Sequence, residues 1–157
     1  MRPCLFLSLF LGLAAPAAAQ TTRPAMPTFT KLTPVLMVDR IAPCLPFWTE
    51  RLGFANVAEV PGPDGQPQFA LLVKDGVEVM YQTFASVAAE DPTLVAGARG
   101  QAAMFFLEVD NLDATLEAMQ GVPIVVPRHT TFYGKEEFAV REPGGAVVIF
   151  AMDAPAK

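Results

Sequence analysis

Few side chains in this sequence carry groups suited to catalysis or metal binding. His129 is the one histidine of the 157-residue chain, and the polar stretch PRHTTFYG around it predicts a loop after a strand. Metal sites usually gather several ligands, so a solvated loop histidine is the simpler interpretation. Glu136 and Glu137 stand near the start of a predicted strand, where alternation directs only one of them inward.

The first residues, MRPCLFLSLFLGLAAPAAAQ, have the pattern of a secretory signal peptide. Arg2 supplies a positive charge, an apolar run follows from Leu5 to Ala15, and small residues then form an Ala-x-Ala cleavage pattern. The run is shorter than the ~20 residues that span a bilayer, which disfavours an uncleaved anchor. We expect removal of residues 1–19, a flexible lead-in at 20–30, and a periplasmic or secreted protein.

The mature chain is acidic and has one cysteine. The whole sequence has 11 basic and 16 acidic residues, and loss of Arg2 leaves ten against sixteen, a net charge of −6. Without a basic stripe, nucleic acid and anionic membranes are disfavoured as partners, whereas neutral or cationic small molecules remain open. Cleavage also removes Cys4, so Cys44 has no disulfide partner in the chain and is expected to be a small buried side chain.

Hydrophobic periodicity predicts two similar sets of elements. The first set is a strand at 33–38, a helix at 41–52, and strands at 54–60, 69–73 and 77–82. After a linker at 85–101, the second set is a strand at 103–109, a helix at 112–119, and strands at 124–126, 137–141 and 146–152. Asp39 and Asp110 precede the two helices and are predicted to cap them.

The two sets are related by a constant offset of 71 residues. Val38-Asp39 corresponds to Val109-Asp110, and Ile41 corresponds to Leu112. A repeated element order indicates duplication of one small unit. We therefore predict an α+β domain at 31–153, built from two βαβββ modules at 31–84 and 102–152.

Several stretches resemble one family when taken together. They are MVDRI, FWTERLGF, GVEVMYQ, FFLEVDNLDA and YGKEEFAVREPGGAVVIF. Their order resembles the vicinal oxygen chelate superfamily, which includes glyoxalase I, extradiol dioxygenases and bleomycin-resistance proteins. The resemblance covers residues 32–151 and implies a curved mixed sheet with a concave site, commonly in a homodimer. It is more specific for the fold than for an activity.

The resemblance also implies where a metal would bind. In metal-dependent members, four ligands come from the first and last strands of the modules, and those positions fall here on Thr33, Glu78, Met104 and Ile149. One carboxylate with a hydroxyl, a thioether and an alkyl side chain does not make a divalent metal site. We therefore expect no metal and no other cofactor.

Period-two neighbours of those positions should line the same concavity. The predicted ligand-binding residues are Thr33, Val35, Met37, Glu78, Met80, Gln82, Met104, Phe106 and Ile149, with Val147 and Ala151 beside them. This lining is mostly apolar, as in many ligand sites; the alternative is a concavity packed shut by Met and Phe. A carboxylate inside it, Glu78, is expected to have a raised pKa, to receive a cationic or hydrogen-bond-donating ligand, or to be paired for structure.

Three functions follow from this reading. The first is an exported, metal-free protein that binds a small apolar ligand without turnover. The second is a glyoxalase-like lyase or isomerase with Glu78 as general base, alone or paired with Glu136 or Glu137; a solvated charged surface is the alternative for those two. The third is an interaction module with a closed cup. Tyr81 is expected to pack beneath a helix, and Tyr133 to lie at the rim.

Overall fold

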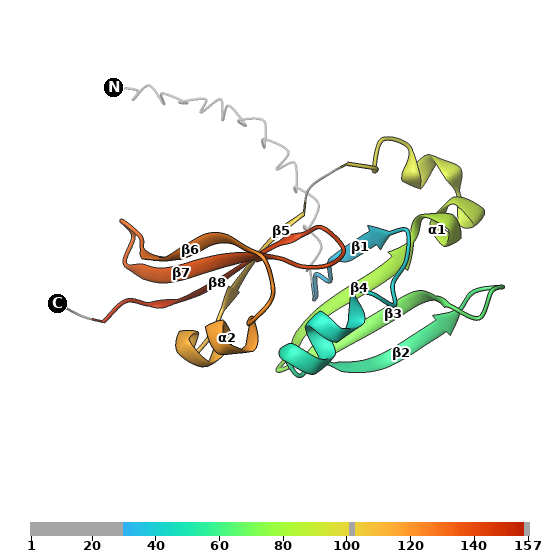
Figure 1. Cartoon of the computed structure of the whole chain (residues 1–157). Helices are drawn as coiled ribbons and strands as arrows, with labels where there is room; N and C mark the ends of the chain where they lie inside the picture. The colour runs from blue at the N-terminus through green and yellow to red at the C-terminus, as the bar shows by residue number, and fades with distance from the viewer. Residues whose placement is uncertain (1–29, 101–102, 156–157) are drawn as a thin grey trace, which may run out of the picture. The chain divides into compact units, whose positions relative to one another are not determined.

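Each half of the chain folds as a four-stranded sheet with a helical segment packed on one side (Figure 1). The computed structural model describes residues 30–100 and 103–155; the predicted signal peptide and most of the lead-in lie outside the described residues. Leu32–Lys157 forms one compact unit. None of the helices in the described part of the chain is long and apolar enough to cross a membrane.

The first module contains the elements that the periodicity predicts. In order they are β1 (Val35–Val38), η1 (Phe47–Arg51), β2 (Ala55–Pro61), β3 (Pro67–Lys74) and β4 (Val77–Thr83). The connection to the second module contains α1 (Phe84–Glu90) and η2 (Pro92–Val95). The second module contains β5 (Met104–Glu108), α2 (Leu112–Ala118), β6 (Ile124–Thr130), β7 (Lys135–Arg141) and β8 (Val147–Asp153).

The strand order is the same in both modules. The sheets run β1-β4-β3-β2 and β5-β8-β7-β6, and in each the first and last strands are parallel while the other pairs are antiparallel. The predicted α+β class with two βαβββ modules is confirmed. The ladders among the described residues form two mixed sheets, one per module, where the prediction had one curved sheet.

One face of each sheet is buried against helical residues, and the offset of 71 relates the buried positions. Ile41 and Leu112 are both buried, as are Trp48 and Met119, which stand 71 residues apart. Buried residues of both modules belong to one hydrophobic cluster. The repeat that the sequence shows is therefore a repeat of core positions.

The first helix is shorter and less regular than predicted. Residues 42–44 form a turn, and η1 has the wide π geometry over Phe47–Arg51. Pro43 and Pro46 lack the N–H that an α-helix would use, which explains the irregular start. Pro34 likewise precedes β1 rather than entering it, so the strand begins at Val35.

The prediction that Asp39 and Asp110 cap the helices is wrong. Asp39 Oδ1 instead pairs with Arg99 Nη2 at 2.9 Å. The N-terminus of α2 is capped by Asn111, whose side-chain oxygen accepts a hydrogen bond from the Ala114 N–H at 2.9 Å. The cap therefore lies one residue later than predicted.

The third strand of the second module is longer than predicted. β6 extends from Ile124 to Thr130, so His129 lies in a strand and not in a loop. Pro127 falls where the β6–β7 register shifts, on an edge strand that tolerates a residue without an N–H. His129 is exposed, as expected for a solvated histidine.

Candidate functional site

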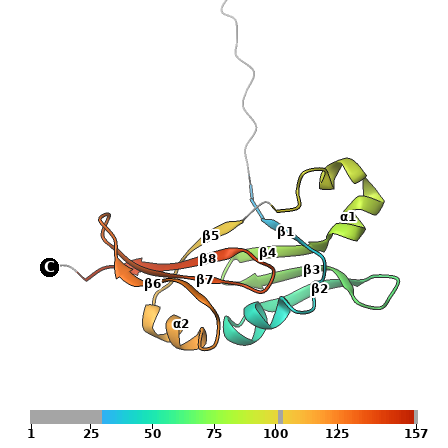
Figure 2. The same ribbon diagram turned by 45° about the horizontal axis from the view of Figure 1, so that its top comes forward.

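The predicted ligand-binding residues lie on the face of each sheet opposite the buried one, which we call the open face. Figure 2 shows η1 and α2 together on the other side of the sheets. Val35, Met104 and Phe106 on the open face are 47%, 66% and 48% exposed, whereas Leu36, which alternates with Val35, is 8% exposed. The strand period of two thus separates core residues from open-face residues.

Strand pairing groups the open-face residues within each module. In the first module Val35 lies opposite Met80, and Met37 lies opposite Gln82. In the second, Met104 lies opposite Val147 and Phe106 opposite Ile149. The nine residues predicted to bind a ligand therefore form two sets, one on each sheet.

Glu78 lies at the start of β4 and is partly exposed. Thr33 Oγ1 is 3.5 Å from Glu78 Oε2, at the long limit of a hydrogen bond. The residues just before β1 and at the start of β4 therefore bring together a hydroxyl and a carboxylate. Gln82, further along the same face, is 3.4 Å from Glu90 Oε1 of α1 through its Nε2.

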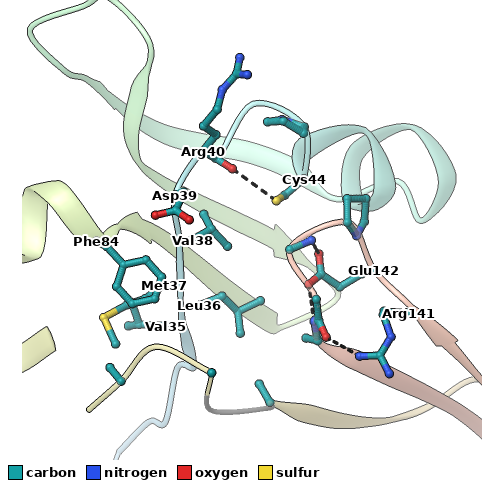
Figure 3. A pocket seen from close by; sticks show the side chains of 18 residues that line it. Val35, Leu36, Met37, Val38, Asp39, Arg40, Cys44, Phe84, Arg141 and Glu142 are labelled. Carbon is teal, nitrogen blue, oxygen red and sulfur yellow. Dashed lines mark hydrogen bonds between the residues drawn. The ribbon is translucent and has the colours of Figure 1, made fainter. Parts of the chain in front are cut away.

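A hollow of about 760 Å³ lies beside β1 (Figure 3). Val35, Met37 and Phe84 border it on one side, and Arg141 and the turn from Glu142 to Gly145 border it on another. Val35 and Met37 are the predicted ligand-binding residues among its lining; Thr33, Glu78, Met80, Gln82, Met104, Phe106 and Ile149 do not border it.

Glu142 at the edge of this hollow is 2% exposed and fully hydrogen-bonded. Its Oε2 accepts from the Tyr81 hydroxyl at 2.9 Å and the Gly144 N–H at 2.7 Å, and its Oε1 accepts from the Ala146 N–H at 2.8 Å. Trp48 Nε1 in turn donates to the Tyr81 oxygen at 2.8 Å. A buried carboxylate with this many donors is a satisfied structural group that links the two modules.

The buried thiol and phenol near Glu142 are held protonated. Burial, together with the nearby Glu142 charge, raises the pKa of Cys44 to about 12. The same two causes, burial first, raise the pKa of Tyr81 well above its usual range. Cys44 is a free buried cysteine, as the sequence predicts, and it is not set up as a nucleophile.

His129, Tyr133 and Glu137 come together on the β6–β7 hairpin. The Tyr133 hydroxyl donates to Glu137 Oε2 at 2.8 Å, and His129 Nε2 lies 3.7 Å from Glu137 Oε1. His129 Nδ1 lies 3.1 Å from the Pro127 carbonyl oxygen. The bond to the Glu137 carboxylate raises the pKa of Tyr133, so the phenol keeps its donating proton.

Alternation separates Glu136 from Glu137, as the sequence predicts. Arg128 Nε donates to Glu136 Oε2 at 3.0 Å, and Arg128 also pairs with Asp113 of α2, so Glu136 belongs to the helix side of the sheet. Glu137 pairs across the ladder with Ala151 on the open face. The sequence singled out both residues but did not pair Glu137 with His129 or Tyr133.

The sequence pattern of one family matches most of the chain. The Glyoxalase/Bleomycin resistance protein/Dioxygenase superfamily matches residues 30–150. The chain belongs to this superfamily. No relative was found among curated protein sequences.

Solved structures of other superfamily members share the fold. TioX from Micromonospora sp. ML1 has a TM-score of 0.64 at 20% identity, over 80% of this chain and 99% of that one. A lactoylglutathione lyase from Agrobacterium tumefaciens has a TM-score of 0.64 at 18% identity, over 80% and 95%. The bleomycin-binding protein of Streptomyces verticillus, complexed with copper(II)-bleomycin, has a TM-score of 0.53 at 22% identity, over 83% and 100%. At these identities the likeness shows the fold alone.

The strand registers show which residues of the two last strands correspond to each other. Equivalent residues of the two first strands, Val35 and Phe106, stand 71 positions apart in the sequence. The residues opposite them on the last strands, Met80 and Ile149, stand only 149 − 80 = 69 positions apart. Val147 is therefore the counterpart of Glu78, and Met80 is the counterpart of Ile149. The even difference keeps both on the same face.

The donor set at these positions does not fit a superfamily metal. Thr33, Glu78, Met104 and Ile149 offer one hydroxyl, one carboxylate, one thioether and one alkyl side chain. Hard divalent ions need several oxygen or nitrogen ligands. Among residues 30–100 and 103–155, no three His, Cys, Asp or Glu side chains are grouped to hold an ion.

Proposed function

We propose that this protein is an exported, metal-free binder of a mainly apolar small molecule, held on the open faces of its sheets. The observation that carries the proposal is the exposure of Val35, Met104 and Phe106, three large apolar side chains on strand faces that no core needs. Exposed apolar surface of this kind commonly marks a ligand or partner site. Polar groups near it, such as Thr33 and Glu78, would orient the ligand.

One structural relative supports the binding of a small molecule. That relative is described as a bleomycin-binding protein in complex with its copper-loaded ligand, so this fold can hold a small molecule. The lack of a fitting metal donor set in the described residues removes the usual Lewis acid of the enzymatic members. Export is proposed from the signal-peptide pattern, and sequestration outside the cytoplasm would follow from it.

A second copy of the chain is the proposed partner. The hairpin-tip residue Phe132 is 100% exposed, and Ile124 and Val125 of the edge strand β6 are 44% and 41% exposed. Such side chains lose contact with water when two copies associate. Sedimentation velocity of the purified protein should give a dimer mass at micromolar concentration, and a monomer mass over that range would contradict it.

Nile red, a neutral apolar dye, tests ligand binding. We expect its fluorescence to rise on titration with the protein, and Phe106→Ala to weaken binding about tenfold. Phe132→Ala is the matched control, because it removes an exposed Phe of the turn between β6 and β7, outside the strands. Equal loss of dye binding in both variants, or no binding by the wild type, would refute the proposal.

The second candidate is a glyoxalase-like lyase or isomerase with Glu78 as general base. The contact between Thr33 Oγ1 and Glu78 Oε2 favours it, because it places a hydroxyl and a proton acceptor together on the open face. Hemithioacetal turnover that disappears in Glu78→Gln, with stoichiometric metal by elemental analysis, would establish this alternative. Turnover absent from the wild type would exclude it for that substrate.

A further inference from the structure

The β6–β7 hairpin carries polar groups at one end of the open face of the second module. Glu137 lies opposite Ala151 across the β7–β8 ladder, and Ile149 and Phe106 lie two positions further along the same face. The hairpin and its neighbouring strands are side by side in Figures 1 and 2. The apolar strip of the proposed ligand site therefore ends at a carboxylate.

Glu137 is held in place but keeps acceptor capacity. Its side chain is 12% exposed, and Tyr133 donates to its Oε2. His129 Nε2 lies 3.7 Å from Oε1, a distance that is beyond hydrogen-bond range. A carboxylate oxygen can accept two hydrogen bonds, so Oε1 can receive a donor from a ligand.

The surrounding charges favour a cation at this point. Lys135 pairs with both Glu108 and Asp153, which lie on the same face of the sheet. Adding Glu137 gives three carboxylates against the one ammonium of Lys135. A mostly buried carboxylate interacts with a cation more strongly than an exposed one, because water screens the pair less.

We propose that Glu137, flanked by Tyr133 and His129, is a subsite for a protonated amine on a ligand whose apolar part lies over Phe106 and Ile149. The ammonium donates to Glu137 Oε1, while the Tyr133 hydroxyl keeps Oε2 oriented. The ligand class is thus an apolar or aromatic primary amine. This inference rests on the proposed function and adds the charge of the ligand to it.

Three naphthalene probes separate the contributions of charge and apolar contact. They are 1-naphthylmethylamine, which is cationic at pH 7, 1-naphthalenemethanol, which is neutral, and 1-naphthaleneacetate, which is anionic. Binding to the full purified protein is followed by amide ¹H–¹⁵N shifts. We expect the amine to bind about tenfold more tightly than the alcohol, a difference of about 1.4 kcal/mol, with shifts at Phe106, Glu137 and Ile149.

Two matched variants locate the effect. Glu137→Gln should remove the preference for the amine and leave binding of the alcohol unchanged. Glu136→Gln removes the same charge one residue away, on the helix side, and should keep the preference. Retention of the preference in Glu137→Gln, or its equal loss in both variants, would overturn the subsite.

The outcomes distinguish this inference from the function on which it rests. If all three probes bind the open face with similar affinity, ligand binding stands and the ammonium subsite is refuted. If no probe shifts the resonances of Phe106 or Ile149, the proposed function and the subsite are both refuted. A tighter complex with the acetate would refute the subsite alone.

Discussion

The Tyr81 hydroxyl joins the two modules, and Tyr81→Phe tests how much this link stabilises the fold. The substitution removes one oxygen and keeps the buried ring. That oxygen accepts a hydrogen bond from Trp48 Nε1 at 2.8 Å and donates one to Glu142 Oε2 at 2.9 Å. Trp48 and Tyr81 belong to the first module, and Glu142 belongs to the second.

Two losses determine the free-energy cost. The Trp48 N–H, in a side chain with 0% exposure, is left without a partner, at a cost of about 1–3 kcal/mol. The bond to the Glu142 carboxylate is charge-assisted, and its loss costs about 1.5–3 kcal/mol. Glu142 keeps two backbone donors, the N–H groups of Gly144 and Ala146. We therefore expect the total loss of stability to lie near the sum of the two lower limits, at about 3 kcal/mol. Domains are stable by only about 5–15 kcal/mol, so this effect is large.

Urea unfolding followed by tryptophan fluorescence and circular dichroism measures the change. A loss of about 3 kcal/mol corresponds to a fall in Tm of roughly 10 °C for a domain of this size. Tyr133→Phe is the matched control: it removes the other tyrosine hydroxyl of the chain, which is bonded to Glu137 at the surface, and should cost less than about 1 kcal/mol.

A double-mutant cycle then isolates the link. Tyr81→Phe removes the donor of this hydrogen bond, and Glu142→Gln removes the charge of its acceptor group and replaces one carboxylate oxygen by an NH2 group. Because both substitutions act on the same bond, their effects should be non-additive by about 0.5–3 kcal/mol. If Tyr81→Phe and Tyr133→Phe destabilise the protein equally, or if the cycle is additive, the reasoning about the buried link is refuted.

Three further predictions follow. Cys44, buried and with its pKa raised to about 12, should resist iodoacetamide at pH 8 until urea unfolds the protein; rapid labelling of native protein would contradict this. Cys44 and Tyr81 both keep their protons to higher pH in the folded state than in the unfolded state. The free energy of unfolding should therefore be at its full value below pH ~9 and fall above it. Cys44 should lower it by about 1.4 kcal/mol per pH unit, and Tyr81 should lower it by as much again above pH ~10. Urea titrations at each pH measure the fall, with Cys44→Ala as the control. Asn111→Ala should cost about 1 kcal/mol by loss of the α2 cap, whereas Asp110→Ala should cost little, as thermal melts would measure.

The strand pattern could be predicted from the sequence because one face of each sheet is buried. Alternation of apolar residues follows from that burial, and the offset of 71 follows from equivalent core positions such as Ile41 and Leu112. Boundaries failed where proline changed the local geometry. Pro43 and Pro46 shortened the first helix. The strand predicted at 124–126 continues through Pro127 to Thr130, because an edge strand accommodates proline.

Side-chain partners distant in sequence could not be predicted. Glu142 stands in the turn EPGG, and the proline and glycines predict the turn but not that a carboxylate is buried there. Position 144 requires a glycine, because a Cβ there would lie 2.8 Å from Glu142 Oε1 and 3.0 Å from Val38 Cγ1. The pairing with Tyr81 depends on how the modules pack, which no local pattern records.

The two modules keep the same chemistry in the core and differ on the open face. The buried pairs Ile41/Leu112 and Trp48/Met119 are all apolar. The corresponding open-face positions differ in kind. Glu78 of the first module corresponds to Val147 of the second. Phe69, which lies opposite Gln82, corresponds to Glu137, which lies opposite Ala151. Packing therefore does not explain these open-face residues. A carboxylate stands at one end of the first sheet and at the opposite end of the second, so the two sheets of the chain present different polar groups beside similar apolar strips.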